Sequence, residues 1–473
     1  MEKPASERVR QLDSWSGPTY QDSISRDDQR IPGVLLETYP ADLGSAPIKA
    51  SRYTDPEFFK KEVDAVFLRT WQYAVLEAEI PQPGDTHVYE LCGHSVLIAR
   101  QRDGSIKAMR NVCLHRGRRL VDMGGCATRY RCPYHGFTWN IDGSFVPNAV
   151  LWDFPEIDPD NFALREIRAE TWAGLVFINF DANARPLLEM LGPLVRHFEQ
   201  WPLDRFYKSA HVGKIMPANW KAVCEAFIEN LHVGATHPQL SPYTTDGNSQ
   251  VDLLSDHVGR AIASIGHASG LVYAGKSLEQ QQIADRLLAN GSRAGKVSPA
   301  PLAGGKTARR EMCDLARKAL GELTGWDYSQ VADAELLDGI SYDFFPNFQP
   351  WGGMATRLCY RIRPDGVNHE RTLMEIMLFS PRPKEGPPPP AQFRMLGEDE
   401  PWSAGTELLH YGPIIDQDYA NMSAIQKGLR DLGNGEIHFG RYSELRCRNL
   451  HRMVDVYIER YEREKQPGKG DLE

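Results

Sequence analysis

Two short segments, each holding one cysteine and one histidine, constrain this chain more than any other feature of its sequence. Cys113 precedes His115 by two positions, and after a gap of sixteen residues Cys132 precedes His135 by three. A [2Fe–2S] cluster with two thiolates on one iron and two imidazoles on the other needs one residue of each type from two loops. A structural zinc site is the alternative, although zinc fingers generally pair Cys with Cys and His with His. The pattern therefore favours an iron–sulfur cluster.

The residues around these two loops predict a small all-β domain over residues 71–182. Short β-like runs separated by Gly and Asp turns cover His87 to Glu90, Ser95 to Arg100, Ala127 to Arg131 and Leu175 to Phe180. Residues 1–50 are rich in Pro, Ser and Asp without a sustained period, which predicts an arm that wraps a partner or stays mobile. A helix over 51–70, with a cap at Thr54, is assigned to the second, larger domain.

The chain is long enough for a second domain, because 473 residues exceed what one ordinary core usually holds. Residues 183–465 show a mixed α+β pattern with an insertion at about 240–340. Helices are predicted near 220–232, 278–289, 309–323 and 419–430, and a hairpin near 354–363 and 372–380. Two stretches, 290–306 and 381–400, have the composition of mobile loops.

Composition excludes several classes of protein. Hydrophobic residues make up 41% and charged residues 25% of the chain, the balance of a soluble globular protein. The net charge of −9 disfavours a protein that tracks nucleic-acid phosphates. Apolar runs are too short to cross a bilayer, and the polar start lacks a signal-peptide core, so we expect a cytoplasmic protein without a membrane segment. Eight scattered cysteines do not form a disulfide framework.

A second set of candidate metal ligands lies in the larger domain. An apolar stripe on the predicted helix comprises Trp220, Val223, Cys224, Phe227 and Leu231, while Glu225, Glu229 and His232 project from the other side. His237 follows His232 by five positions, so the helix must end or distort near Gly234 for both imidazoles to reach one ion.

Two histidines need a carboxylate to complete a triad that leaves coordination positions open for dioxygen. Asp418 is the candidate because Met422, Ile425 and Leu429 of the following helix lie in line with it, so that its side chain points inward. Helix N-capping is the alternative role for Asp418. Asp416 lies on the other side and is expected to be an N-cap or a surface acid.

Both sets of residues resemble motifs of one known family. The Cys–His loops resemble Rieske [2Fe–2S] loops, and without the extra cysteines of the respiratory-chain type they are closer to soluble oxygenases. Three further segments look like the catalytic-domain motifs of Rieske non-heme iron ring-hydroxylating oxygenase α subunits, in particular phenylpropionate-type and other aromatic-ring dioxygenases. These are Asn219-Trp220-Lys221, Glu229-x-x-His232-x4-His237-Pro238, and Asp418 with Asn421-Met422.

The resemblance implies a fold and a set of cofactors. The fold is α+β, a small all-β Rieske domain joined to a helix-grip (START/Bet v1-like) catalytic domain. One [2Fe–2S] cluster is then held by Cys113, His115, Cys132 and His135, and one mononuclear Fe(II) by His232, His237 and Asp418. Electrons come from NAD(P)H through a reductase, with or without a ferredoxin.

The resemblance also implies a role for Glu229 and an oligomeric state. In the family an acid at this position links the iron site to the Rieske histidine of the neighbouring subunit, which requires a head-to-tail ring, a homotrimer (α3) or α3β3. That acid is usually Asp, and Glu229 is a departure found in branches related to carnitine and choline monooxygenases. Five arginines near the cluster form a basic rim that either docks an acidic ferredoxin or reductase or neutralises the cluster: Arg116, Arg118, Arg119, Arg129 and Arg131.

Three functions follow, in order of preference. The first is dihydroxylation, with O2, of a small hydrophobic aromatic or polycyclic compound, in a pocket beside the iron lined by Phe227, Ile228, Leu231 and Phe345. The second is a Rieske monooxygenase or an O/N-demethylase. The third is a non-catalytic protein that carries electrons and binds a ligand.

Overall fold

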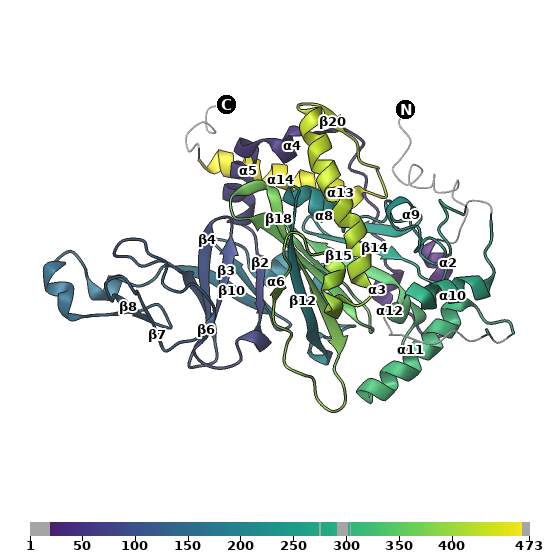
Figure 1. The fold of residues 1–473 in the computed structure, drawn as a ribbon, viewed down its shortest axis with the longest axis horizontal. Helices are drawn as coiled ribbons and strands as arrows, with labels where there is room; N and C mark the ends of the chain where they lie inside the picture. The colour runs from purple at the N-terminus through teal and green to yellow at the C-terminus, as the bar shows by residue number, and fades with distance from the viewer. Residues whose placement is uncertain (1–18, 274–275, 291–300, 303, 466–473) are drawn as a thin grey trace. The chain divides into compact units, whose positions relative to one another are not determined.

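The computed structural model describes residues 19–273, 276–290, 301–302 and 304–465, which form two compact units (Figure 1). The β unit comprises residues 60–190, 364–368 and 458–465. The α+β unit comprises the described parts of 19–59, 191–363 and 369–457. The structure thus combines a small all-β domain with a larger α+β domain.

The β unit contains a seven-stranded and a three-stranded sheet. The larger sheet, in the order β2-β11-β10-β5-β4-β3-β6, consists of β2 (Gln72–Leu76), β3 (Asp85–Leu91), β4 (His94–Arg100), β5 (Ile106–Arg110), β6 (Gly125–Cys126), β10 (Glu166–Trp172) and β11 (Leu175–Asn179). The smaller consists of β7 (Arg129–Arg131), β8 (Thr138–Asn140) and β9 (Phe145–Val146). Five short helical segments complete the unit: η2 (Val63–Phe67), η3 (Glu77–Glu79), η4 (Ala149–Asp153), η5 (Pro159–Asn161) and most of α6 (Leu187–Leu191).

Two tight hairpins fix the register of the larger sheet. Cys92 and Gly93 join β3 to β4 with φ values of 48° and 80°, and Ala173 and Gly174 join β10 to β11 with φ values of 51° and 81°. Two successive positive φ angles make a turn whose twist matches that of the paired strands. Beneath the cluster loops lies an apolar core that contains Phe137, Trp139 and Phe145.

The α+β unit is built on an eight-stranded sheet in the order β13-β14-β15-β16-β17-β18-β12-β19. Its strands are β12 (Phe206–Met216), β13 (Gln250–Leu253), β14 (Val258–Ala263), β15 (Gly339–Phe344), β16 (Phe348–Pro350), β17 (Arg357–Asp365), β18 (Asn368–Pro381) and β19 (Arg394–Met395). A two-stranded sheet pairs β1 (Ile48–Lys49) with β20 (Glu436–Ile437).

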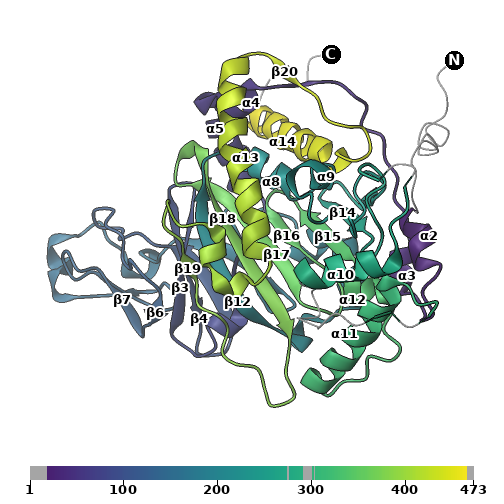
Figure 2. The same cartoon turned by 45° about the vertical axis from the view of Figure 1, so that its right-hand side comes forward.

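Helices cover this sheet. They are α2 (Tyr20–Ile24), α3 (Gly33–Leu36), α4 (Ser51–Thr54), α5 (Pro56–Glu62), α7 (Pro193–Phe198), η6 (Leu203–Arg205), α8 (Trp220–Ala226), α9 (Val233–Thr236), α10 (Gln280–Asn290), α11 (Ala308–Thr324), α12 (Asp333–Leu337), η7 (Trp402–Ala404), η8 (Thr406–Leu408), α13 (Tyr411–Leu432) and α14 (Leu445–Glu464), with α5 and α14 each continuing into the β unit. The long helix α13 lies along one face of the sheet (Figures 1 and 2), where Lys214 of β12 contacts the ring of Tyr419.

Several elements match the sequence predictions and others do not. The helices expected near 278–289 and 309–323 are α10 and α11, and the expected hairpin is β17–β18. The single helix expected over 51–70 is instead α4, α5 and the π turn η2, and the chain passes from the α+β unit to the β unit after Phe59. Much of the expected loop 290–306 lies outside the described residues, while 381–400 is described and contains β19.

The arm is the clearest departure in the fold. Its described part was expected to wrap a partner or stay mobile, yet it packs on its own α+β unit, where Val34 and Leu35 are buried. Arg260 of β14 donates to the carbonyl oxygens of Val34 and Glu37. Buried hydrogen bonds over more than 200 positions in sequence leave no local periodicity, so the sequence could not reveal them. Among the described residues no helix combines the length and apolar character needed to span a bilayer.

Candidate metal centres

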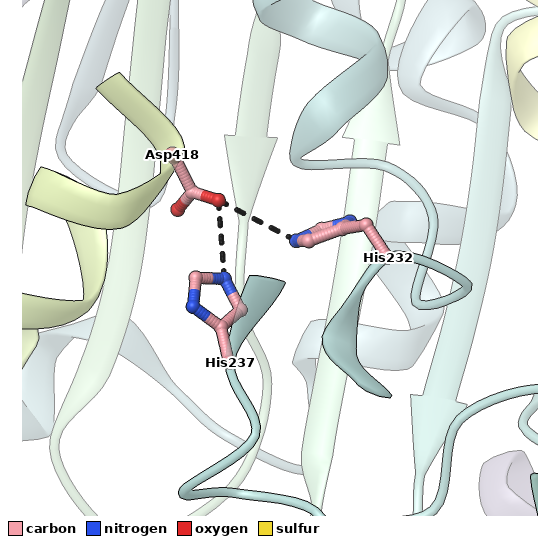
Figure 3. A group of neighbouring side chains, drawn as sticks. All are labelled: His232, His237 and Asp418. Atoms are coloured by element: carbon pink, nitrogen blue, oxygen red, sulfur yellow. Dashed lines mark ion pairs between the residues drawn. The ribbon is translucent and has the colours of Figure 1, made fainter. Parts of the chain in front are cut away.

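His232, His237 and Asp418 meet in the α+β unit, each with a ligand atom facing the other two (Figure 3). Asp418 Oδ1 lies 3.1 Å from Nε2 of His237 and 3.5 Å from Nε2 of His232. All three candidate ligand atoms lie within 4.8 Å of one another. Two imidazole nitrogens and one carboxylate oxygen form the donor set preferred by ferrous iron that keeps positions open for dioxygen, so the residues present fit the ion.

The break between α8 and α9 brings the two histidines together. We predicted one helix over 220–232, but α8 ends at Ala226, and α9 is a separate turn with His232 at its N-cap and His237 at its C-cap. Residues five apart point to different sides of a continuous helix, whereas residues that flank a single short turn can face one point. The distortion expected near Gly234 therefore lies earlier in the chain.

Glu229 stabilises this break. One of its carboxylate oxygens accepts hydrogen bonds from the backbone N–H groups of Leu231 and His232, the latter at 3.2 Å, and so holds the segment between α8 and α9. The other oxygen is hydrogen-bonded to Nδ1 of His232. Burial disfavours protonation of His232, but this hydrogen bond and the charges of Glu229 and Asp418 outweigh it and raise the His232 pKa. Because Nδ1 is bonded to Glu229, Nε2 faces Asp418.

Asp418 lies well inside α13 and not before it. The helix was expected over 419–430 but begins at Tyr411. Pro413 is compatible with this earlier start because it falls in the first turn, where no backbone N–H is needed. Asp418 and Met422 are buried as predicted, whereas Ile425 is 41% exposed and Gln426 takes the inner position. An N-cap role for Asp418 is thereby excluded.

Asp416 has a structural role that the sequence did not reveal. Its carboxylate accepts hydrogen bonds from the backbone N–H groups of Trp402, at 2.6 Å, and Ser403, at 3.2 Å. Asp416 therefore caps η7 and not its own helix.

Two glutamines missed by sequence reasoning lie beside the candidate iron ligands. Nδ1 of His237 lies 2.8 Å from Oε1 of Gln417, and Gln239 Nε2 donates to the same oxygen at 2.7 Å. Since a glutamine oxygen only accepts, His237 donates from Nδ1 to Gln417, and its Nε2 faces Asp418. Glutamine is common at helix surfaces, so only the neighbouring Asp418 could have drawn attention to Gln417.

The two cluster loops of the β unit have the same backbone geometry. The backbone N–H of Cys113 donates to the carbonyl oxygen of Arg118 at 2.7 Å. The carbonyl oxygen of Cys113 accepts from the N–H of Gly117 at 2.9 Å. Cys132 does the same with Phe137 and Gly136, at 2.8 and 2.9 Å. Gly117 and Gly136 both have positive φ, 73° and 77°, a region that favours glycine.

The four side chains of these loops meet with thiols inside and imidazoles outside. Cys113 and Cys132 are each 2% exposed, while the rings of His115 and His135 lie 4.7 Å apart in more open positions. Burial raises the pKa of Cys113, and the adjacent Cys132 adds to this, so a bare thiolate is disfavoured until a metal neutralises it. Burial, and then the charges of His135 and Arg116, lower the pKa of His115. Two thiols and two imidazoles on matched loops fit a [2Fe–2S] cluster.

The predicted basic rim is less uniform than its sequence suggests. Arg119 pairs with Glu90 of β3 at 3.0 Å, and Arg118 lies 3.4 Å from Asp122, so two of its charges have acidic neighbours. Arg116 lies 5.3 Å from the ring centroid of Tyr134, which in turn lies 3.8 Å from that of His135.

The residues predicted to line a pocket divide into two groups. Phe227 contacts Tyr360 of β17, with ring centroids 4.9 Å apart, and Ile228 is buried. The charge of Asp418 contributes to the raised pKa of Tyr360, after burial and the charge of Tyr411, which indicates that this aromatic cluster adjoins the iron ligands. Leu231 is 38% exposed because the helix has already ended, so its assignment to the apolar stripe was wrong. Phe345 packs on Tyr457 and His257 instead.

Comparison with known protein families finds a matching family for each of two segments of the chain. Residues 70–150 match the Rieske [2Fe-2S] domain, and residues 194–460, more than half of the chain, match the ring hydroxylating alpha subunit (catalytic domain). The chain belongs to the ring-hydroxylating alpha subunit family. These Rieske non-heme iron oxygenases are oxidoreductases that incorporate O2, and their two domains imply one Rieske cluster and one mononuclear iron.

Relatives of this ring-hydroxylating alpha subunit include mono- and dioxygenases. The chain is 33% identical over 212 residues to the carnitine monooxygenase oxygenase subunit of Escherichia coli (strain K12), covering 44% of this chain and 57% of the relative. It is 34% identical over 196 residues to the large oxygenase component of the naphthalene 1,2-dioxygenase system of Pseudomonas putida, covering 39% and 42%. The chain thus spans about half the length of the curated relatives it matches.

Solved structures show the same fold over most of this alpha subunit. The apo form of a quaternary ammonium Rieske monooxygenase aligns with a TM-score of 0.60 at 18% identity, covering 89% of this chain and 99% of that one. Naphthalene 1,2-dioxygenase from Rhodococcus sp., bound to indole, aligns with a TM-score of 0.58 at 18% identity, covering 87% and 94%.

Proposed function

We propose that this chain is a terminal oxygenase component that uses O2 and electrons from NAD(P)H, delivered by a reductase with or without a ferredoxin, to hydroxylate a small organic substrate. One observation carries the proposal: a single chain contains the matched Cys–His loops and a triad of two histidines and one carboxylate, in which His237 and Asp418 are buried. Reduction of dioxygen needs more electrons than one ferrous ion holds, so a second store of electrons in the same chain fits this chemistry.

Each group of side chains has a distinct task in this proposal. Cys113, His115, Cys132 and His135 hold the [2Fe–2S] cluster, and His232, His237 and Asp418 hold Fe(II). When bound, the cluster supplies single electrons and the ferrous ion supplies an open position for dioxygen. Gln417 fixes the His237 ring, and Glu229 holds Nδ1 of His232, from which it links this site to the cluster of the neighbouring subunit.

For the substrate we propose an aromatic or polycyclic compound that is dihydroxylated. The contact of Phe227 with Tyr360 and the burial of Ile228 support an apolar, aromatic surface beside the iron ligands. The reaction adds both atoms of O2 to two carbons of the ring and consumes two electrons and two protons.

The second candidate is monooxygenation of a quaternary ammonium compound. It is favoured by Glu229, since the family usually has Asp at this position, and by the similarity to carnitine monooxygenase oxygenase subunits. Aromatic rings such as Phe227 and Tyr360 attract a cation to their faces as well as they stack on another ring. This reaction inserts one oxygen atom and releases the other as water, again with two electrons and two protons.

For the assembly we propose a head-to-tail trimer, with or without β subunits. The cluster imidazoles are the more open side of their centre, and the loop beside them carries exposed apolar groups, including Trp152, which is 82% exposed. Glu444 lies near Glu225 and Glu229, whose charges act with burial to raise its pKa, and together these acids suit a basic partner surface. The rim of Arg116, Arg118, Arg129 and Arg131 has the complementary charge.

The first test is the metal content of anaerobically purified protein. We expect three iron atoms and two acid-labile sulfides per chain and a Rieske signal in electron paramagnetic resonance after reduction with dithionite. Asp418→Ala should leave two iron atoms and the Rieske signal, while Asp416→Asn, a matched change two residues away that keeps an acceptor, should leave all three. Two iron atoms in the wild type after ferrous reconstitution would refute the iron site.

The second test separates the two reactions. The loaded enzyme, with a surrogate reductase and NADH, is given naphthalene or carnitine under ¹⁸O2. A diol with two ¹⁸O atoms supports the aromatic proposal, whereas one ¹⁸O atom incorporated into carnitine-derived product supports the second candidate. Under both candidate reactions, we expect the His232→Ala variant to lose dioxygen consumption with either substrate.

A further inference from the structure

A cavity of about 550 Å³ lies in the α+β unit between the arm, α4 and α14, apart from the iron ligands. Its size falls in the range of sites that hold small organic molecules. Its wall contains Lys49, Arg52, Arg448 and Arg452 against the single carboxylate of Asp455, which pairs with Arg52 at 2.8 Å. The cavity is therefore a local centre of positive charge in a chain whose net charge is −9.

Arg448 contributes a buried charge to this wall. It is 6% exposed, and its guanidinium group donates to the carbonyl oxygens of Gly440, Ala46 and Phe439. Among the described residues no carboxylate forms an ion pair with it. Carbonyl dipoles satisfy the hydrogen-bond donors of a guanidinium but do not cancel its charge, so Arg448 leaves a positive potential at the cavity.

Two other cations of the wall form ion pairs with exposed partners, although Arg452 also donates hydrogen bonds to the buried Oδ1 of Asn449, at 3.0 and 2.7 Å. Lys49 pairs with Glu436 at 2.7 Å, and their side chains are 59% and 45% exposed. Arg452 pairs with Asp256 at 2.6 Å, and their side chains are 37% and 67% exposed. Exposed ion pairs contribute about 0–1 kcal/mol, so both cations can exchange these partners for an incoming anion at little cost.

Apart from Ser51 and His451, the rest of the lining is apolar. Leu43, Pro47, Ile48 and Phe58 contribute to the wall, and the guanidinium of Arg52 lies 4.8 Å from the ring centroid of Phe58. Cations and apolar side chains around one cavity suit a ligand with an anionic group and an apolar body. Guanidinium groups bind carboxylates with paired hydrogen bonds, which adds geometric selectivity to the charge.

We propose that this cavity binds a small organic carboxylate with an apolar, ring-sized body, with the carboxylate on Lys49 and Arg452 and the body against Leu43, Ile48 and Phe58. The proposal does not depend on the proposed oxygenase reaction, because every residue involved lies outside the iron and cluster sites. It can therefore fail while the oxygenase proposal stands, and the reverse also holds.

Calorimetric titration of the full chain, with both metal centres loaded and at low salt, tests this site with benzoate, benzamide and inorganic phosphate. We expect benzoate to bind and the double variant Lys49→Gln/Arg452→Gln to weaken it at least tenfold. Lys49 is exposed and Arg452 is partly exposed, and circular dichroism can verify that the double variant retains the fold. The matched control Arg286→Gln/Lys427→Gln removes one exposed arginine and one exposed lysine outside the cavity lining and should leave the affinity unchanged.

Benzamide and phosphate separate the contribution of the ligand's charge from that of its apolar body. Benzamide, which has the same ring without the charge, should bind at least tenfold more weakly than benzoate, and phosphate should also bind more weakly because it gains nothing from the apolar wall. Equal binding of benzoate to the wild type and to Lys49→Gln/Arg452→Gln would overturn the proposal, since the benzoate would then occupy another site, such as the iron. If phosphate bound as tightly as benzoate, the proposal that the ligand has an apolar organic body would be refuted.

Discussion

Gln417 decides which nitrogen of His237 is available at the iron site. Its Oε1 lies 2.8 Å from His237 Nδ1 and accepts a hydrogen bond from it, so that Nε2, 3.1 Å from Asp418 Oδ1, is the nitrogen that faces the other two candidate ligands. We expect Gln417→Leu to lower the affinity for Fe(II) about 10–100-fold, because the ring loses its fixed tautomer and orientation. Anaerobic titration of the iron-depleted protein with Fe(II) measures this effect.

The controls for Gln417 separate positioning from packing. Gln417→Glu retains an acceptor for the Nδ1 proton and should restore most of the affinity, a rescue that a purely structural role would not show. Gln282→Leu, an exposed glutamine on α10, should have no effect. If Gln417→Leu bound Fe(II) as tightly as the wild type, the orientation of His237 would have to come from elsewhere.

The residue scale also shows what the sequence could and could not reveal about the site. The spacing of His232 and His237 and the apolar positions after Asp418, together with the family resemblance, predicted that these three side chains meet. The apolar positions alone left an N-cap role open for Asp418, and one of them, Ile425, is exposed. Leu231 was misplaced because the apolar period continues past Ala226, whereas the helix does not. Gln417 was missed because its role depends on a contact across 180 positions of the chain, which no local pattern records.

At the scale of single elements, a buried histidine fastens α7 to the sheet. His197 is fully buried and lies 3.0 Å, through Nδ1, from the hydroxyl of Tyr342 on β15. Burial, followed by the charges of Arg260 and Arg196, lowers the pKa of His197 to about 4. The folded chain therefore keeps His197 neutral down to low pH, whereas in the unfolded chain it takes up a proton below about pH 6.5.

This difference predicts a pH-dependent stability. As the pH falls below about 6.5 the unfolded state binds a proton that the folded state refuses, so the free energy of unfolding decreases, by up to about 1.4 kcal/mol per pH unit, until the pH approaches the folded pKa. The melting temperature of the wild type should thus fall more between pH 7.5 and 5.5 than that of His197→Gln, which cannot titrate. Parallel curves for the two proteins would show that His197 does not contribute.

A second element depends on Asp416. Because its carboxylate accepts two backbone N–H groups of η7, Asp416→Ala should leave both without a partner and destabilise the chain by about 1–3 kcal/mol. Chemical denaturation of wild type, Asp416→Ala and Asp416→Asn measures this, with Asn expected to fall between the other two since it keeps one acceptor oxygen. Equal stability of all three would mean that η7 does not need this cap.

Elements with a strong local period were predictable, and elements defined by distant contacts were not. The helices α10 and α11 and the hairpin β17–β18 follow from the spacing of their apolar residues and from their turns. The start of α13 was missed since Gly412 and Pro413 imitate a turn signal. The arm was missed because its fixed position depends on the buried Arg260, whose side chain reaches Val34 and Glu37.

At the scale of the whole molecule, the proposed trimer predicts that the cluster of one subunit serves the iron of the next. Two variants that each lack one centre test this: Cys132→Ser, which loses the cluster, and Asp418→Ala, which loses the iron. Each should be inactive alone. Co-expressed in equal amounts, they form mixed rings in which an intact cluster faces an intact iron site at about one interface in four.

The mixed preparation should therefore recover about a quarter of the wild-type rate of substrate-dependent dioxygen consumption per chain, which is about half of the wild-type rate per mononuclear iron. This result cannot arise if each cluster serves the iron of its own chain, because no chain in the mixture carries both centres. Mixing the two purified homotrimers without exchange of subunits is the control and should give no activity. A mixed preparation that remained inactive, although mass spectrometry showed both chains in one ring, would refute electron transfer between subunits and with it the linking role of Glu229.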